Sequence, residues 1–302
     1  MNNSLPYNVA DHTKVYGNKH FRHYLVGKNH DLLIECGVTA SANQFIKQLV
    51  DSRIGAPDKL LVMHAHFDHV CGIPVLKHNF PDAKVLSSAA AAKVLKNPKV
   101  VENFFDQDRQ ISRYFSANMV APEVGLPICP NRIEVDRIVN GGDLIALKGG
   151  EILKLIPAPG HSPCGLAAWF EKDRALFVSD ALGFQISDEK VFPVFFHAYQ
   201  PYIETIKRLA KYPADTLAFP HERIWQGKSV KAIFLRALSA AQNVRDEIVS
   251  EAEKGIDLSN LKQMLFDRFY CKNLRIYSTE NIRLCVDLLV RRSLEDGFAG
   301  NF

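Results

Sequence analysis

Short apolar runs alternate with amphipathic segments through the first two thirds of the chain. The apolar runs have the length and composition of β-strands, and the segments between them repeat their apolar positions at the helical period. Strands interleaved with helices indicate an α/β protein or a layered αββα arrangement rather than a pure β-barrel or β-sandwich. The expected strands are residues 24–26, 31–36, 59–63, 84–86, 152–156, 166–170, 175–178 and 216–219, and the expected helices are residues 43–50, 88–95, 100–116 and 202–211.

The last quarter of the chain has a different pattern. Residues 230–253, 258–270 and 280–295 are amphipathic at the helical period and contain no strand-like run. We therefore divide the chain into a domain of residues 1–226 and a C-terminal helical extension of residues 227–302. The extension is expected either to cover one face of the core or to form a wall of a substrate pocket.

An aromatic-rich segment lies in the middle of the chain. Residues 100–124 contain two pairs of aromatic residues, Phe104 with Phe105 and Tyr114 with Phe115, and then a loop-like tail. Two interpretations of this segment stay open. It is either a packed surface helix or a lid over a functional site.

Composition and charge exclude several classes of protein. The chain has 302 residues, 47% of them hydrophobic, and a net charge of +4 without a block of lysine and arginine, so nucleic acid is not an expected partner. No apolar run approaches the ~20 residues that span a bilayer, and the N-terminus lacks the pattern of a signal peptide. We therefore expect a cytoplasmic protein without membrane contact, whose oligomeric state the sequence does not indicate. The six cysteines are scattered and form no C-x-x-C pair, as expected of buried thiols in a reducing compartment.

The densest group of chemically active residues follows the apolar run 59–63. The segment from His64 to His69 reads H-A-H-F-D-H and therefore holds three imidazoles and one carboxylate. Because His64 and His66 are two residues apart, they point to the same side of an extended chain and can bind one ion. Asp68 and His69 come where the chain is expected to turn into a helix, so they project elsewhere, toward a second ion. Imidazole and carboxylate are ligands of borderline metals such as zinc and iron.

Three further candidate ligands follow predicted strands. His161 lies in a loop constrained by proline and glycine, Asp180 ends an apolar strand where an unpaired charge is costly, and His221 ends another strand. Taken alone, each of them is as consistent with an ordinary structural or surface residue as with a metal ligand. Their recurrence at strand ends, after the H-x-H-x-D-H segment, indicates one composite metal site.

Taken together, these residues resemble the ligand pattern of the metallo-β-lactamase superfamily. The resemblance covers about residues 20–226 and implies a four-layer αββα sandwich, here an α/β fold followed by the C-terminal helical extension. It also implies two divalent metal ions at the edge of the two sheets, zinc foremost, with iron or manganese as alternatives. In this pattern the first ion is bound by His64, His66 and His161, the second by Asp68, His69 and His221, and both by the bridging Asp180.

Details of the motif narrow the resemblance. The combination of Asp68, His69 and Asp180 is similar to the hydrolase branch that includes glyoxalase II and the lactonases. The chain length and residues 179–183 look, more loosely, like the thioesterase of quinolone signal biosynthesis, which cleaves 2-aminobenzoylacetyl-CoA. Two positions depart from the family pattern, because residues 35–37 read Glu-Cys-Gly in place of Asp-x-Gly and the last histidine is followed by Glu-Arg in place of Gly.

The resemblance implies a hydrolase that uses a hydroxide activated by two metal ions to cleave an ester-like carbonyl, with a thioester favoured and a lactone possible. By the same resemblance, Asp68 orients the hydroxide and passes a proton to the leaving group, and the partner is a small-molecule acyl substrate. His197, in an aromatic segment, is a candidate substrate-binding residue of an acyl pocket. The alternatives are a phosphodiesterase and a regulatory binding protein that retains the metal site.

Overall fold

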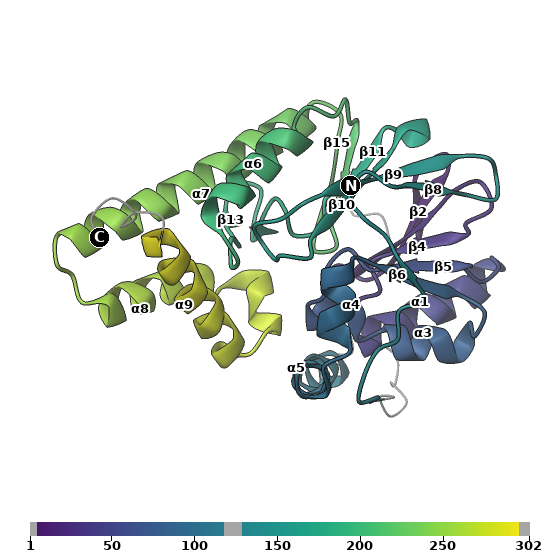
Figure 1. Ribbon diagram of the computed structural model, residues 1–302, viewed down its shortest axis with the longest axis horizontal. Helices are drawn as coiled ribbons and strands as arrows, with labels where there is room; N and C mark the ends of the chain where they lie inside the picture. Colours follow the sequence, from purple (N-terminus) through teal and green to yellow (C-terminus); the bar gives the residue numbers. More distant parts are fainter. Residues whose placement is uncertain (1–4, 118–128, 296–302) are drawn as a thin grey trace.

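Two β-sheets packed face to face form the centre of the computed structural model, which describes residues 5–117 and 129–295 (Figure 1). The first sheet consists, in spatial order, of β1 (Tyr7–Ala10), β2 (Thr13–Gly17), β3 (Arg22–Val26), β4 (Leu32–Ile34), β5 (Lys59–Leu61), β6 (Lys84–Ser87) and β7 (Arg137–Ile138). Its strands are antiparallel from β1 to β4 and parallel from β4 to β7.

The second sheet is mostly antiparallel. In spatial order it consists of β15 (Ile224–Gln226), β14 (Thr216–Ala218), β11 (Ala175–Phe177), β10 (Leu166–Phe170), β9 (Ile152–Pro157) and β8 (Leu144–Ala146). β11 and β14 are parallel, and β10 is antiparallel to both β9 and β11. The strands β9, β11 and β14 therefore run in the same direction and end at the same edge of the sheet. A separate short pair is formed by β12 (Phe184–Gln185) and β13 (Val191–Phe192).

Helices cover the outer face of each sheet (Figure 1). On the side of the first sheet lie α1 (Thr39–Ser52), α3 (Ile73–Asn79), α4 (Ala89–Leu95) and α5 (Pro98–Ala117), and on the side of the second lie α6 (Tyr199–Leu209) and α7 (Ser229–Glu253). The predicted αββα layering is therefore confirmed. The segment predicted at residues 100–124 is helical in α5, and its part from residue 118 lies outside the described residues.

The core explains why the strands read as continuous apolar runs. Leu61 and Met63 join the apolar cluster between the two sheets, whereas Leu60 and Val62 join the cluster between sheet and helices. β10 alternates in the same way along its length. Since neighbouring side chains of a strand point to opposite faces, and both faces are covered, every position is apolar.

The predicted C-terminal helices are present as α7, α8 (Leu258–Phe269) and α9 (Thr279–Glu295), with the short 3-10 helix η2 (Lys272–Ile276) between the last two. α7 packs on α6 and β15, and α8 and α9 pack on α7 and on each other. The Asp257 carboxylate accepts a hydrogen bond from the N–H of Ser259, which explains why α8 begins there. In the described part of the chain, no helix combines the length and apolarity needed to cross a membrane.

A buried histidine links the first sheet to α1. His23, on β3, is fully buried with its ring centroid 5.4 Å from that of Phe45 on α1, and its Nδ1 donates a hydrogen bond to the Glu35 carbonyl oxygen. Burial lowers the pKa of His23 from 6.5 to about 4. His23 is therefore neutral at pH 7, and protonating it requires that its environment open.

This shift makes the stability of the fold depend on pH. Because the pKa of His23 is lower in the folded than in the unfolded chain, its contribution is complete above pH 6.5 and is lost as the pH falls from 6.5 toward 4. Between pH 7 and pH 5 we expect the wild type to lose about 2 kcal/mol more unfolding free energy than His23→Gln, which does not titrate. Urea denaturation of both proteins at the two pH values measures the difference, and equal losses would contradict this assignment.

Candidate metal centre

The sheet topology brings the candidate ligands to one edge. His64 and His66 follow the end of β5, and the next residues form the short helix α2 (Phe67–Val70), which carries Asp68 and His69. The other three candidates, His161, Asp180 and His221, follow β9, β11 and β14, the strands that end at the same edge of the second sheet. The change from extended chain to helix after His66 separates the segment into two pairs, as the sequence predicts.

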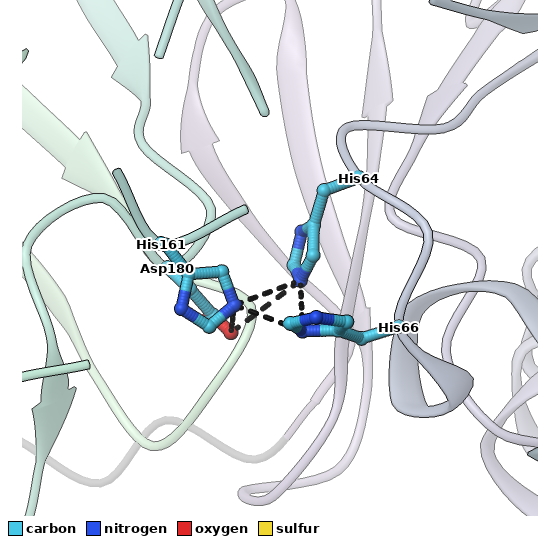
Figure 2. A group of neighbouring side chains, drawn as sticks. All are labelled: His64, His66, His161 and Asp180. Carbon is cyan, nitrogen blue, oxygen red and sulfur yellow. Dashed lines mark hydrogen bonds and ion pairs between the residues drawn. The ribbon is translucent and has the colours of Figure 1, made fainter. Parts of the chain in front are cut away.

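One group of side chains is formed by His64, His66, His161 and Asp180, whose ligand atoms all lie within 4.8 Å of one another (Figure 2). The Nε2 atom of His161 lies 3.2 Å from Nε2 of His64 and 2.9 Å from Nδ1 of His66. Oδ2 of Asp180 lies 3.3 Å from Nε2 of His161 and 3.7 Å from Nε2 of His64. Three imidazoles and one carboxylate thus face one point.

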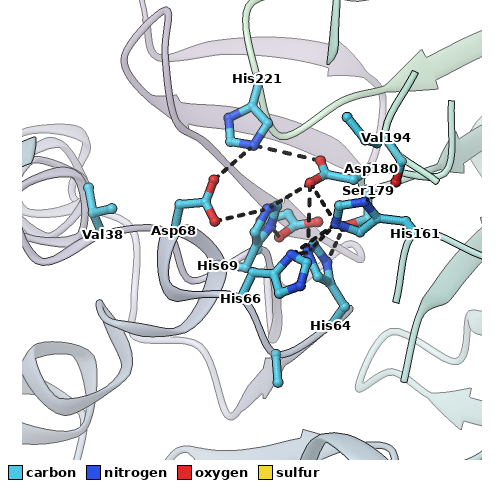
Figure 3. A network of polar contacts seen from close by, with 12 residues as sticks. Val38, His64, His66, Asp68, His69, His161, Ser179, Asp180, Val194 and His221 are labelled. Carbon is cyan, nitrogen blue, oxygen red and sulfur yellow. Dashed lines mark hydrogen bonds and ion pairs between the residues drawn. The ribbon is translucent and has the colours of Figure 1, made fainter. Parts of the chain in front are cut away.

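A second group consists of Asp68, His69 and His221 and lies beside the first (Figure 3). The Asp68 oxygens are 3.7 Å from Nε2 of His69 and 3.5 Å from Nε2 of His221. Asp180 belongs to both groups by position, because its Oδ2 is 3.4 Å from Nε2 of His69 and its Oδ1 is 3.7 Å from Nε2 of His221. The structure therefore brings together all seven predicted ligands and places Asp180 where a bridging residue belongs.

In three of the rings, the nitrogen that points away from the centre is hydrogen-bonded, so the other nitrogen faces the centre. Nδ1 of His161 donates to the Val194 carbonyl oxygen at 2.8 Å, and Nδ1 of His221 donates to the His20 carbonyl oxygen at 2.9 Å. Nδ1 of His69 lies 2.6 Å from the Glu35 carboxylate, and its Nε2 has no hydrogen-bond partner. Histidine ligands of metals characteristically donate their other N–H to a carbonyl or carboxylate.

This arrangement fits metal ions. The Nε2 atoms of His161, His221 and His69 converge with the carboxylates of Asp68 and Asp180 in a largely buried space, where uncompensated charge is costly. A cation satisfies all of them at once. Because the donors are imidazole nitrogens and carboxylate oxygens without a thiolate, they suit zinc, iron or manganese.

The electrostatics of the cluster agree with this fit. Burial lowers the pKa of His64 well below 6.5 and that of His66 to about 3, so both rings are neutral, as a ligand must be. Burial also opposes a charge on His69, but the carboxylates of Glu35, Asp68 and Asp180 outweigh it and raise the pKa of His69. The field that draws a proton to His69 is the one that attracts a divalent cation.

Glu35 occupies the position at which the family pattern has aspartate. It follows β4, is buried, and has a left-handed backbone (φ 67°) that directs its carboxylate to His69. At Gly37 a Cβ atom would lie 2.4 Å from Oγ of Ser41, so this turn requires glycine. The departure at residue 35 is visible in the sequence, but its contact with a candidate ligand is not. The only sequence signal for this contact is that a carboxylate is retained at that position.

The second departure from the family pattern, at Glu222, also helps to orient a candidate ligand. Glu222, which follows His221, has a carboxylate oxygen 2.8 Å from Nδ1 of His20. The His20 carbonyl oxygen in turn accepts the hydrogen bond from the His221 ring. Glu222 thus fixes the position of His20, which in turn orients the His221 ring.

A cavity of about 270 Å³ opens from the cluster toward the C-terminal helices. Its floor contains Asp68 and Asp180, and α5 contributes Phe104 to one wall. Residues of η2 and α9, and Tyr277 between them, also line the cavity, so the extension does line a pocket at this site. His197 does not line this cavity; its neighbour Phe196 does. The role of His197 in substrate binding therefore stays a prediction.

An αββα sandwich with a histidine and aspartate cluster at the sheet edge defines a class of metal-binding proteins. The model of the metallo-β-lactamase superfamily matches residues 23–221, more than half of the chain, and the protein belongs to this superfamily.

Solved structures share the fold at low sequence identity. An archaeal metallo-β-lactamase superfamily protein from Sulfolobus tokodaii is 18% identical with a TM-score of 0.54, over 94% of this chain and 92% of that chain. A β-lactamase from Chitinophaga pinensis is 20% identical with a TM-score of 0.58, over 81% of this chain and 94% of that chain. The rubredoxin:oxygen oxidoreductase of Desulfovibrio gigas is 16% identical with a TM-score of 0.56, over 79% of this chain and 62% of that chain.

The Glu35 contact gives a test of the metal centre. Glu35→Gln keeps the size of the side chain and removes its charge, so we expect metal affinity to fall about 10- to 100-fold. Glu35→Asp restores the residue usual in the family but shortens the side chain, and we expect a similar loss because the backbone is placed for glutamate. Competition with a chromogenic chelator measures the affinity, and Glu189→Gln, at an exposed carboxylate, is the matched control. Wild-type affinity in both Glu35 variants would refute the contact's role.

Proposed function

We propose that the protein hydrolyses an ester-like carbonyl, with a thioester as the favoured substrate and a lactone as the second choice. One observation carries the proposal: five of the seven clustered candidate ligands line an apolar cavity, namely His66, Asp68, His161, Asp180 and His221. Among its described lining residues there is no lysine or arginine, and its upper walls are built mainly from phenylalanine, leucine and isoleucine. An uncharged acyl group suits such a cavity, whereas a phosphodiester would find no cationic side chain there to assist the metal ions.

The size of the cavity limits what enters it. A volume of about 270 Å³ is at the small end of ligand pockets, so it takes one acyl group and not a whole cofactor-sized thiol. The leaving group then stays at the mouth, near Leu284, which is both exposed and part of the lining. The resemblance to glyoxalase II, and more loosely to the thioesterase of quinolone signal biosynthesis, supports a thioester.

The roles of the residues follow from their positions. His64, His66 and His161 would hold one divalent ion, Asp68, His69 and His221 a second, and Asp180 both. Bound there, two divalent cations lower the pKa of water to near neutrality and polarise a carbonyl oxygen. Asp68 lines the cavity, and its carboxylate is placed to accept a proton and return it to the departing thiolate or alkoxide.

Purified protein loaded with zinc, iron or manganese tests the proposal against a panel of substrates. The panel contains benzoyl and medium-chain acyl-CoA, acyl-glutathione, acyl-homoserine lactones and bis-p-nitrophenyl phosphate. We expect the highest kcat/KM for an acyl thioester. Turnover of the phosphodiester alone would replace the proposal by a phosphodiesterase. No turnover of any of these compounds by metal-loaded protein would refute it.

A variant at Asp68 tests the assigned proton transfer. Asp68→Asn keeps the shape of the side chain but cannot carry a proton between water and leaving group, so kcat is expected to fall about 10²- to 10⁴-fold. Metal content measured on the same preparation separates a loss of chemistry from a loss of metal. Asp82→Asn, at an exposed position, is the matched control. Unchanged kcat in Asp68→Asn would contradict the role.

A further inference from the structure

A tyrosine of the C-terminal extension reaches the metal centre. Tyr277 lies between η2 and α9, is 6% exposed and lines the cavity. Its hydroxyl donates a hydrogen bond to Oδ2 of Asp68 at 2.8 Å, although the two residues are 209 positions apart in the sequence. Four other candidate ligands, His64, His69, His161 and His221, are hydrogen-bonded to residues between positions 20 and 194, so Asp68 differs from them in its partner from the C-terminal extension.

The surroundings of Tyr277 fix the position of its hydroxyl. The backbone N–H of Tyr277 donates to the Leu274 carbonyl oxygen at 3.1 Å, and its own carbonyl oxygen accepts from the Tyr270 hydroxyl at 3.0 Å. Its ring lies edge-on to the rings of Phe67 and Phe184, with centroids 6.1 and 6.2 Å away. A ring held by both backbone and packing presents its hydroxyl at one place.

The geometry at Asp68 gives this hydrogen bond a chemical consequence. Oδ1 of Asp68 faces His69, whereas Oδ2 faces both His221 and the Tyr277 hydroxyl. A phenol is protonated at neutral pH and can only donate to a carboxylate. Tyr277 therefore fixes the rotation of the carboxylate and determines which oxygen stays available on the cavity side.

We propose that Tyr277 is a positioning residue for the reaction and acts through Asp68. This inference rests on the proposed function, in which Asp68 moves a proton in the cavity. The helical extension is then part of the catalytic apparatus as well as a wall of the pocket. The extension contributes by orienting the Asp68 carboxylate and not by adding affinity for the substrate.

Tyr277→Phe removes the hydroxyl and keeps the ring. With metal in excess we expect kcat to fall about 10- to 100-fold, as for the loss of one hydrogen bond to a charged group, while KM changes less than about twofold. The control is Tyr212→Phe, which removes the same hydroxyl from a ring that packs on Trp169, and it is expected to behave as wild type. Wild-type kcat in Tyr277→Phe would overturn the proposal.

A double variant shows whether Tyr277 acts through Asp68. If it does, Tyr277→Phe has little further effect on kcat in an Asp68→Asn background, whereas additive losses would overturn the proposal. Thermal unfolding within about 4 °C of wild type shows that Tyr277→Phe remains folded.

A readout independent of turnover separates this inference from the proposed function. Chelator competition on Tyr277→Phe is expected to show about tenfold weaker binding of one metal equivalent and unchanged binding of the other. Unchanged binding of both equivalents would count against the positioning role. If wild-type protein hydrolyses none of the carbonyl substrates, the proposed function fails, and this metal measurement still tests the action of Tyr277 on Asp68.

Discussion

The structure is organised around one electrostatic constraint, which is that imidazole nitrogens and carboxylate oxygens converge in a buried space. Such a cluster is unfavourable in a protein interior unless cations occupy its centre. The surrounding hydrogen bonds all preserve this arrangement. The carbonyl oxygens of Val194 and His20 and the carboxylate of Glu35 each bind the far nitrogen of a ring and thereby aim the near nitrogen inward.

The topology of the two sheets brings these ligand groups together. Strands of both sheets end at one edge, so residues from β5, β9, β11 and β14 meet although they are distant in the sequence. The layers behind them are apolar on both faces and fix the strand ends. α5 and the C-terminal helices then line a small cavity above the cluster, and the described residues of its lining include no cationic side chain. The ligand cluster is thus built from the strand ends, and most of the cavity above it is built from helices.

The sequence predicted the parts that local patterns encode. The H-x-H-x-D-H segment, the ligands at strand ends and the helical extension all follow from spacing and periodicity, and the long helices were placed within a few residues. The strands missed were β1, β2, β7, β8, β12, β13 and β15; all of them except β2 have at most four residues, too few for a clear periodic pattern. The contacts of Glu35 and Tyr277 with ligands were also missed. They join residues distant along the chain, and no local pattern records such a pairing. An aromatic run alone does not tell which of its residues faces a cavity, and here Phe196 lines the cavity whereas His197 does not.

Elemental analysis of purified protein is the decisive experiment on the metal centre. We predict close to two equivalents of zinc, iron or manganese per chain, and loss of both in Asp180→Ala, because Asp180 faces both groups of ligands. His78→Ala, at an exposed histidine, should retain the full content. Protein that binds no metal even after incubation with these ions, or an Asp180→Ala variant with wild-type content, would contradict the account.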